Sequence, residues 1–320
     1  MSQADMIIFN QEFAPAISDT LAQMINAFNE SSGGAIVLEM SGNMGDYINQ
    51  SFYDLLATRR VDRYAANTSE ANTDLSQSEH VSVKVAGGMG PIAYLPSQMT
   101  WLRKPTDEGI EVFSRQFAEL LLQDQLNTCI LSAVSGIGNN ALAVNDVSGG
   151  AVITQSAING GHAKFGDASQ RLITDVMTGS VYHKLISQGL TNTEQLFQSG
   201  NVTVVGILGK RVVVTDAPAL LNTTPTPDQD IVLSLVSGGL TVKDPADPIV
   251  NIQTNNGNKM IETTMQADYD FTLDLKGYSW DKSNGGASPV DADLATGSNW
   301  DLDTADVKNT AGTLTIGDIA

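Results

Sequence analysis

The sequence is poor in the residues from which most catalytic and metal sites are built. It has one cysteine, Cys129, and three histidines, His80, His162 and His183. A lone cysteine excludes an intrachain disulfide and most thiolate metal sites, and we interpret Cys129 as a small buried hydrophobe. No histidine stands at metal-ligand spacing, and no H-E-x-x-H, G-x-S-x-G or P-loop motif is present. We therefore expect no catalytic residue, no bound cofactor and no metal site.

Basic residues are scarce as well. The chain has 17 Lys and Arg against 36 Asp and Glu, a formal net charge of −19, and residues 1–58 contain no base at all. Such a balance repels phosphate backbones and anionic membranes, which excludes tight sequence-specific DNA binding. No apolar run approaches the 18 residues of a membrane-spanning helix, and the start of the chain lacks the basic region of a signal peptide. We expect a reducing, aqueous compartment and no membrane partner.

Two patterns come close to ligand-binding motifs without matching them. Residues 136–141 have the glycine spacing of a dinucleotide-binding loop but follow a helical pattern rather than a strand, so we interpret them as a helix-ending turn. Aspartates recur between residues 291 and 306, yet Thr296 stands where a calcium-binding EF-hand loop requires glycine. For this acidic run we favour polar surface.

The N-terminal residues have helical spacing of their apolar side chains. This spacing predicts a helix over residues 15–30, with Pro15 suited to its first turn and Gly33-Gly34 to its end. A second, short helix is predicted over residues 45–57.

The character of the sequence then changes. A polar stretch, residues 67–78, is followed by alternation at Val81, Val83 and Val85 and by a glycine-rich stretch, residues 87–91. Alternation predicts a strand, and its polar and glycine-rich flanks predict a long, exposed two-stranded excursion. Because an isolated two-stranded hairpin is marginally stable in water, this segment needs a neighbour to lie on.

A long helix is predicted over residues 106–135, with Thr106 as its N-cap. After it, an α/β-like region is predicted, with helices at 155–163, from 167 and at 180–188, and strands at 172–177, 202–208 and 211–215. Extended antiparallel structure follows, with strands at 231–236, 249–254, 260–265 and 271–275. The tail, residues 282–320, has few large apolar residues and is expected to be loop-like unless docked.

Several motifs resemble one protein family when taken together and in order. They are FGD at 165–167, DVMTGSVYHKL at 175–185, GKRVVVTD at 209–216, WD at 280–281, GGA at 285–287, Pro289, Leu294-Ala295, NWD at 299–301 and KNTAG at 308–312. In this spacing they resemble the major capsid proteins of tailed double-stranded DNA bacteriophages, whose capsid fold is shared with encapsulins and herpesvirus shells. The resemblance covers nearly the whole chain.

The resemblance implies an α+β fold with four parts. These are an N-terminal arm (1–58), an extended two-stranded loop (59–103) lying across a neighbouring subunit, a peripheral domain with a long spine helix and long strands (104–149 and 251–320), and an α/β axial domain (150–250). It also implies a structural protein, not an enzyme, that self-assembles as hexamers and pentamers into the icosahedral head enclosing packaged DNA.

The implied partners are further copies of the chain, together with scaffolding, portal and decoration proteins. Packaged DNA would touch the inner face weakly. The implied location is the virion, after assembly in the host bacterial cytoplasm. Two alternatives stay open, an encapsulin-like compartment shell and an unrelated enzyme or ligand-binding protein, although the scattered histidines and single cysteine disfavour the second.

Seven of the 17 bases fall between residues 59 and 115. This concentration suggests that a basic segment of one subunit meets the acidic surface of another. We expect intersubunit contacts from Arg59, Arg60, Arg63 and Lys84. The alternative is that these side chains are solvated or pair within their own subunit.

Overall fold

The computed structural model describes residues 3–41, 45–53, 60–66, 69, 77–95, 106–188, 193–199, 202–207, 210–243, 248–257 and 259–319. Within these ranges the strands form two eight-stranded sheets, here called sheet A and sheet B, which pack with helices. The α+β class predicted from the sequence is confirmed.

Sheet B is a mixed sheet built around β10. Its strand order is β4-β16-β10-β5-β8-β7-β6, and β9 also pairs with β10. Strand β10 runs antiparallel to β16 and β5, whereas β5 and β8 are parallel. The strands are β4 (Val144–Asp146), β5 (Leu172–Met177), β6 (Thr193–Ser199), β7 (Val202–Ile207), β8 (Lys210–Val214), β9 (Leu221–Asn222), β10 (Gln229–Val236) and β16 (Gly312–Asp318).

Both faces of sheet B are covered, because successive side chains of a strand point to opposite faces. On one face, Val232 packs in a buried cluster with Ile158 and Val181, which lie on the helices α3 (Gln155–Ala163) and α4 (Gly179–Ser187). On the other face, Ile231 and Leu233 belong to the main core. Strand β10 is therefore a central strand with almost no contact with water, as its continuous apolar run suggests.

The two short helices begin at threonine N-caps. The Thr154 hydroxyl accepts the backbone N–H of Ala157, and the Thr178 hydroxyl accepts that of Val181. Each bond satisfies one of the free N–H groups in a first helical turn. The helices predicted at 155–163 and 180–188 are thus found, with local sequence sufficient to start them.

Sheet A is built around β13, which is 14 residues long. Its order is β1-β11-β13-β14-β15, while β12 and β3 also pair with β13, and β2 pairs with β3. The strands are β1 (Ile36–Glu39), β2 (Tyr47–Tyr53), β3 (Gln77–Tyr94), β11 (Leu240–Lys243), β12 (Ile249–Asn255), β13 (Glu262–Leu275), β14 (Tyr278–Trp280) and β15 (Trp300–Leu302). The predicted strands at 260–265 and 271–275 are parts of one continuous strand.

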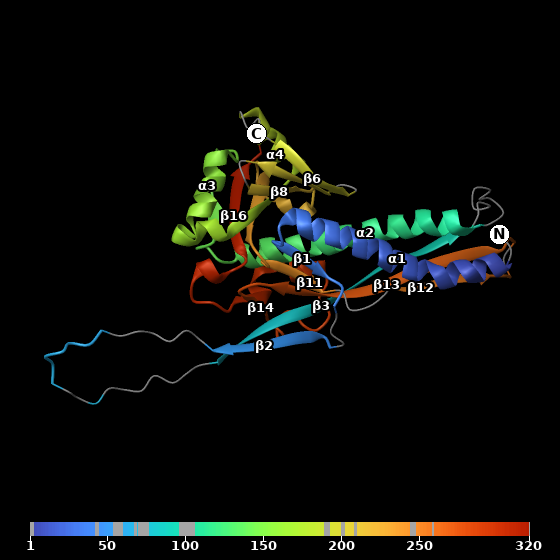
Figure 1. Cartoon of the computed structure of the whole chain (residues 1–320), viewed down its shortest axis with the longest axis horizontal. Coiled ribbons are helices and arrows are strands. Elements are labelled where there is room, and N and C mark those ends of the chain that lie inside the picture. The colour runs from blue at the N-terminus through green and yellow to red at the C-terminus, as the bar shows by residue number, and fades with distance from the viewer. Residues whose placement is uncertain are drawn as a thin grey trace.

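Two long helices cover sheet A. Helix α1 (Gln3–Ser32) and helix α2 (Thr106–Gly138) pack side by side (Figure 1). Ile17 and Phe28 of α1 and Phe117 and Leu121 of α2 are buried in the main core. A short helix, α5 (Asp291–Leu294), and 3-10 turns at Gly166–Arg171, Pro218–Leu220, Gly297–Asn299 and Val307–Asn309 complete the helical structure. None of the helices in the described ranges is long and apolar enough to cross a membrane.

The molecule is elongated in one plane (Figure 1). Sheet B with α3 and α4 lies at one side, and the long strands β3, β12 and β13 run beside α1 and α2 toward the N-terminus. At the opposite end, β2 and β3 lead to residues 60–66, which lie far from the rest of the protein. The strand predicted around residues 81–85 is part of β3, but the glycine-rich stretch 87–91 is not the exposed flank that the sequence suggested, because β3 pairs with β13 inside sheet A. Of the predicted polar flank, residues 67, 68 and 70–76 lie outside the described residues.

Two expectations about the N-terminal region are corrected. Residues 47–53 form strand β2 rather than a helix, because they pair antiparallel with β3, with Tyr47 opposite Val83. This pairing overrides a helical spacing that is ambiguous over so few residues. Pro15 lies inside α1 rather than at its start. Gly33 and Gly34 end the helix as predicted, with positive φ of 72° each.

The tail, which was expected to be loop-like unless docked, is docked. Strand β16 is inserted in sheet B between β4 and β10 and is buried along nearly its whole length. Strand β16 begins at Gly312, where a residue with a Cβ would clash with the Ser234 carbonyl oxygen of β10. The aspartates of the acidic run act in local turns: the Asp293 carboxylate accepts the N–H of Val290, and that of Asp306 accepts the N–H of Lys308.

Candidate assembly surface

The tip segment of the excursion, residues 60–66, exposes both charged and apolar side chains. Val61 is 66% exposed and Tyr64 is 92% exposed, and Arg60 and Arg63 are exposed beside them. The backbone bonds of this segment are local, from Tyr64 N–H to the Asp62 carboxylate (2.9 Å) and from Ala65 N–H to the Asp62 carbonyl. Tyrosine and arginine are enriched at protein–protein interfaces, so this combination is typical of an interaction surface.

The four residues predicted to make intersubunit contacts fall in different places. Arg59 lies outside the described residues, whereas Arg60 and Arg63 lie together in the tip segment. Lys84 lies on β3 within sheet A, and its ammonium group binds the Asp270 carboxylate of the same chain at 3.1 Å. The structure therefore brings two of the predicted residues together and gives Lys84 a partner within the subunit.

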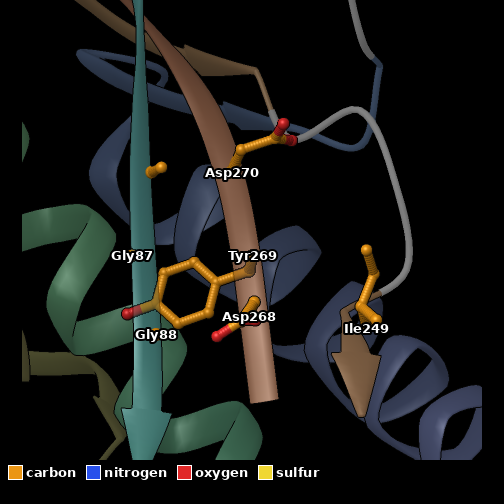
Figure 2. Close-up of a pocket in the computed structure, with 7 residues that line it drawn as sticks. Gly87, Gly88, Ile249, Asp268, Tyr269 and Asp270 are labelled. Atoms are coloured by element: carbon orange, nitrogen blue, oxygen red, sulfur yellow. The ribbon is translucent and has the colours of Figure 1, made fainter. Parts of the chain in front are cut away.

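A groove opens on sheet A where β3, β13 and the start of β12 meet (Figure 2). It has a volume of about 560 Å³ and is lined by Ala86, Gly87, Gly88, Ile249, Asp268, Tyr269 and Asp270. The strand register sets its shape: Ala86, Gly87 and Gly88 stand opposite Asp270, Tyr269 and Asp268. Small residues on β3 thus leave room between two carboxylates and a ring on β13.

Gly87 is required by the position of Tyr269. A Cβ at Gly87 would lie 2.6 Å from the Tyr269 ring, which projects from β13 toward β3 (Figure 2). In this position the Tyr269 hydroxyl donates a hydrogen bond of 2.7 Å to the Asp124 carboxylate of α2. Burial raises the pKa of Asp124, an effect that this hydrogen bond opposes. The ring therefore ties the floor of the groove to α2.

The rim of the groove is acidic and partly apolar. Asp268 is exposed and is not ion-paired in the described part of the chain, although its carboxylate accepts a hydrogen bond from the Gln266 amide at 3.1 Å. The Asp270 carboxylate is ion-paired with the Lys84 ammonium group. At the other side of the groove, Ile249 is 76% exposed on β12. Groups of this kind favour a partner that carries both cations and apolar side chains.

The base of the excursion is fixed by a buried histidine that the sequence did not single out. His80 on β3 lies between two carboxylates, with Nε2 2.8 Å from Asp274 and Nδ1 2.5 Å from Asp303. Burial lowers the pKa of His80, but the hydrogen bonds and charges of the two aspartates outweigh it and raise the pKa to about 9. The imidazolium thereby joins β3, β13 and the C-terminal tail.

A second histidine has the neighbours of a hydrolase triad in the wrong arrangement. His162 Nε2 lies 2.9 Å from Asp175 and 3.2 Å from the Ser234 hydroxyl, and Nδ1 faces the Lys210 ammonium group at 3.0 Å. A triad needs the acid on Nδ1 and the serine on Nε2, with an accessible hydroxyl. Ser234 is fully buried. This network holds α3 against sheet B.

The structure gives other sequence features structural roles. Cys129 is buried, and burial raises the pKa of its thiol to about 12. Trp280 and Trp300 stack edge to face at 4.9 Å, and a Cβ at Gly285 would meet the Trp280 ring. The described residues contain no group of three or more histidine, cysteine or acidic side chains placed to hold a metal ion.

The chain was compared with known proteins. A family model described as Gp13-like, "Major capsid protein 13-like", matches residues 5–314. Among solved structures, the capsid asymmetric unit of cyanophage Pam1 is similar with a TM-score of 0.51 at 11% sequence identity, covering 88% of this chain and 87% of that chain. A protein of Mycobacterium phage Cain is similar with a TM-score of 0.49 at 11% identity, covering 91% and 89%. No curated protein matches the chain significantly.

Proposed function

Because the chain belongs to the Gp13-like family of major capsid proteins, we propose that its copies assemble as hexamers and pentamers into an icosahedral phage head. In this head the excursion of one subunit lies across a neighbouring subunit. The observation that carries the proposal is the tip segment, residues 60–66, which lies far from the rest of the subunit (Figure 1) and in which Tyr64 is 92% exposed.

The family assignment itself fixes the general function. The chain is a structural protein of a tailed-phage capsid, not an enzyme, and it acts in the virion by associating with copies of itself. The sequence resemblance to tailed-phage major capsid proteins is confirmed, and the encapsulin alternative is not favoured.

The free energy of the excursion supports assembly through it. Residues 60–66 gain little from burial within their own subunit, because every side chain of this segment is exposed. Contact with a second subunit covers the apolar side chains of the tip segment, and this gain offsets the entropy lost when the segment is ordered. Symmetric repetition then lets every copy both give and receive the same contact.

The division into an N-terminal arm (1–58), extended loop (59–103), peripheral domain (104–149 and 251–320) and axial domain (150–250) is part of the proposal. Sheet B supplies most of the proposed axial domain but also recruits β4 and β16 from outside residues 150–250. This exchange would hold the axial and peripheral domains in one orientation within the subunit.

Other partners are proposed from the role of a head protein. Scaffolding, portal and decoration proteins would bind it during or after assembly in the host cytoplasm. Packaged DNA would contact the inner face weakly, since a net charge of −19 opposes tight binding of phosphate.

Charge reversal in the excursion tests the proposal. We expect Arg59→Glu with Arg60→Glu to lower the yield of shells while the subunit keeps its circular dichroism spectrum and melting temperature. A control that reverses two exposed bases elsewhere, Lys164→Glu with Lys276→Glu, should assemble like the wild type. Negative-stain electron microscopy and light scattering, with and without a co-expressed phage scaffold, measure the yield. Normal yield from the excursion variant would contradict the proposal.

A further inference from the structure

The tip segment and the groove on sheet A carry opposite charge. In the described residues 60–66, Arg60 and Arg63 outweigh Asp62, and Arg59 precedes them in the sequence. In the groove, Asp268 and Asp270 outweigh the single nearby cation, Lys84. Opposed charges of this kind steer two surfaces together and select their register.

The apolar parts match as well. Val61 and Tyr64 are exposed on the tip segment, and Ile249 is exposed at the side of the groove. Ile249 stands opposite Asp268 across the β12–β13 pair, so an apolar side chain and a carboxylate lie next to each other in the groove. Its volume of about 560 Å³ is in the range of pockets that take up several side-chain groups.

A subunit is badly placed to fill its own groove. Residues 60–66 lie beyond the β2–β3 pair, at the end of the molecule away from β12, where Ile249 begins the strand (Figure 1). The hydrogen bond network of His80 with Asp274 and Asp303 holds the base of the excursion in this direction. A second copy, whose tip segment points toward the first, meets no such restriction.

We propose that the groove lined by Gly88, Asp268 and Ile249 receives the tip segment of a neighbouring copy. Arg60 or Arg63 of the neighbour pairs with Asp268, and Tyr64 lies against Ile249. This inference rests on the proposed function, since it names the receiving surface for the same excursion.

A charge exchange tests the pairing. Asp268→Arg alone, and Arg60→Asp with Arg63→Asp, should each lower the shell yield about tenfold or more, because every copy in the shell carries the change. The triple variant that combines these changes should recover most of the yield. Asp301→Arg, which reverses an exposed aspartate on β15, is the matched control and should assemble normally. Circular dichroism melting shows that each subunit is folded.

The outcomes separate the two claims. If the variant with Arg60→Asp and Arg63→Asp fails to assemble while Asp268→Arg assembles normally, the groove assignment is wrong and the proposed function stands. If Asp268→Arg fails and the triple variant does not recover, the pairing is wrong. If the wild type forms no shells even with a scaffold, the proposed function fails and the groove assignment fails with it.

A cross-link provides a second measurement that does not depend on yield. Tyr64→Cys with Ile249→Cys should form disulfide-linked ladders of subunits in oxidised shells on a non-reducing gel, and each single cysteine variant should not. The buried Cys129 stays in all variants as a common background. Shells without ladders would overturn the proposal.

Discussion

Sheet B and the ribbon formed by β3, β12 and β13 differ in where their side chains find partners. In β10 of sheet B, nearly every residue is buried, whereas β12 has no buried residue and exposes more than half of its side chains. Sheet B interleaves strands from distant parts of the chain and closes its core within the subunit. The ribbon leaves an acidic groove and leads to an exposed tip segment.

The difference indicates that the residues that stabilise the folded subunit and the residues that bind other subunits lie in different regions of the chain. Contacts that stabilise the subunit are made by sheet B and by the main core, to which Val83 of β3 and Phe271 of β13 also belong. Side chains without cover in the described part of the subunit gather on β12, at the rim of the groove and in the tip segment. A change in the first region should therefore alter the stability of the subunit, and a change in the second should alter the yield of shells.

The largest difference in the free energy of unfolding is expected when an isoleucine is truncated to alanine in β10 of sheet B and, separately, in β12. Ile231→Ala in β10 removes a side chain that is 5% exposed and should lower the free energy of unfolding by about 4 kcal/mol. Ile249→Ala in β12 removes one that is 76% exposed and should change it by about 0.5 kcal/mol or less. Urea denaturation of the isolated subunits measures both. Equal losses would contradict the comparison.

Two ion pairs provide the next test. Lys184 binds Asp230 at 3.0 Å beneath α4, and the Asp230 side chain is only 3% exposed. Lys184→Met would leave that carboxylate buried without its cation and should cost about 3 kcal/mol. Lys84 binds Asp270 at 3.1 Å in the ribbon, where the Asp270 side chain is 39% exposed. Lys84→Met should cost about 1 kcal/mol or less, as for an exposed pair. A larger loss from Lys84→Met would reverse the ranking.

The base of the excursion should be sensitive to pH. The folded pKa of His80, about 9, lies above its ordinary value of 6.5, so its ion pairs contribute fully below pH 6.5. That contribution, on the order of 1 to 2 kcal/mol after allowance for solvent screening, is lost as the pH rises through 9. The stability difference between wild type and His80→Gln should therefore shrink from pH 6 to pH 10. A constant difference across this range would exclude the charged histidine.

The last stability test concerns the floor of the groove. Gly87→Ala places a Cβ against the Tyr269 ring and should cost about 1 to 2 kcal/mol through overpacking. In a Tyr269→Ala background the same substitution should cost much less, because the ring is gone. Thermal melts of the four proteins form a double-mutant cycle. Additive effects would show that the ring does not require glycine at this position.

Elements with strong local signals were predictable from the sequence. The strand at 172–177 and the helix at 155–163 occur at the predicted residues. The long helix, predicted over 106–135, begins where predicted and ends three residues later, at residue 138. Their apolar periodicity is encoded within a few turns of the chain, as is the Thr154 N-cap of the helix at 155–163, whereas Thr106, predicted as an N-cap, is the first residue of α2. The FGD and DVMTGSVYHKL motifs carried the family resemblance because they lie in this same locally defined region.

Features that depend on distant pairing were not predictable. Strand β16 has only two large apolar side chains, Leu314 and Ile316, and it is held by β10 more than 70 residues earlier in the chain. His80 interacts with aspartates 194 and 223 residues away, so no spacing in the sequence marks it. Gly87 and Gly88 were visible as a glycine-rich stretch, but the groove follows from their register with β13.

Hydrogen exchange of the isolated subunit and of assembled shells tests the central claim most directly. We predict that the amides of β10 are strongly protected in both states, whereas the amides of residues 60–66, whose described backbone bonds are local, gain protection only in shells. Equal protection of residues 60–66 before and after assembly would contradict the account, since the excursion would then have no partner in the shell.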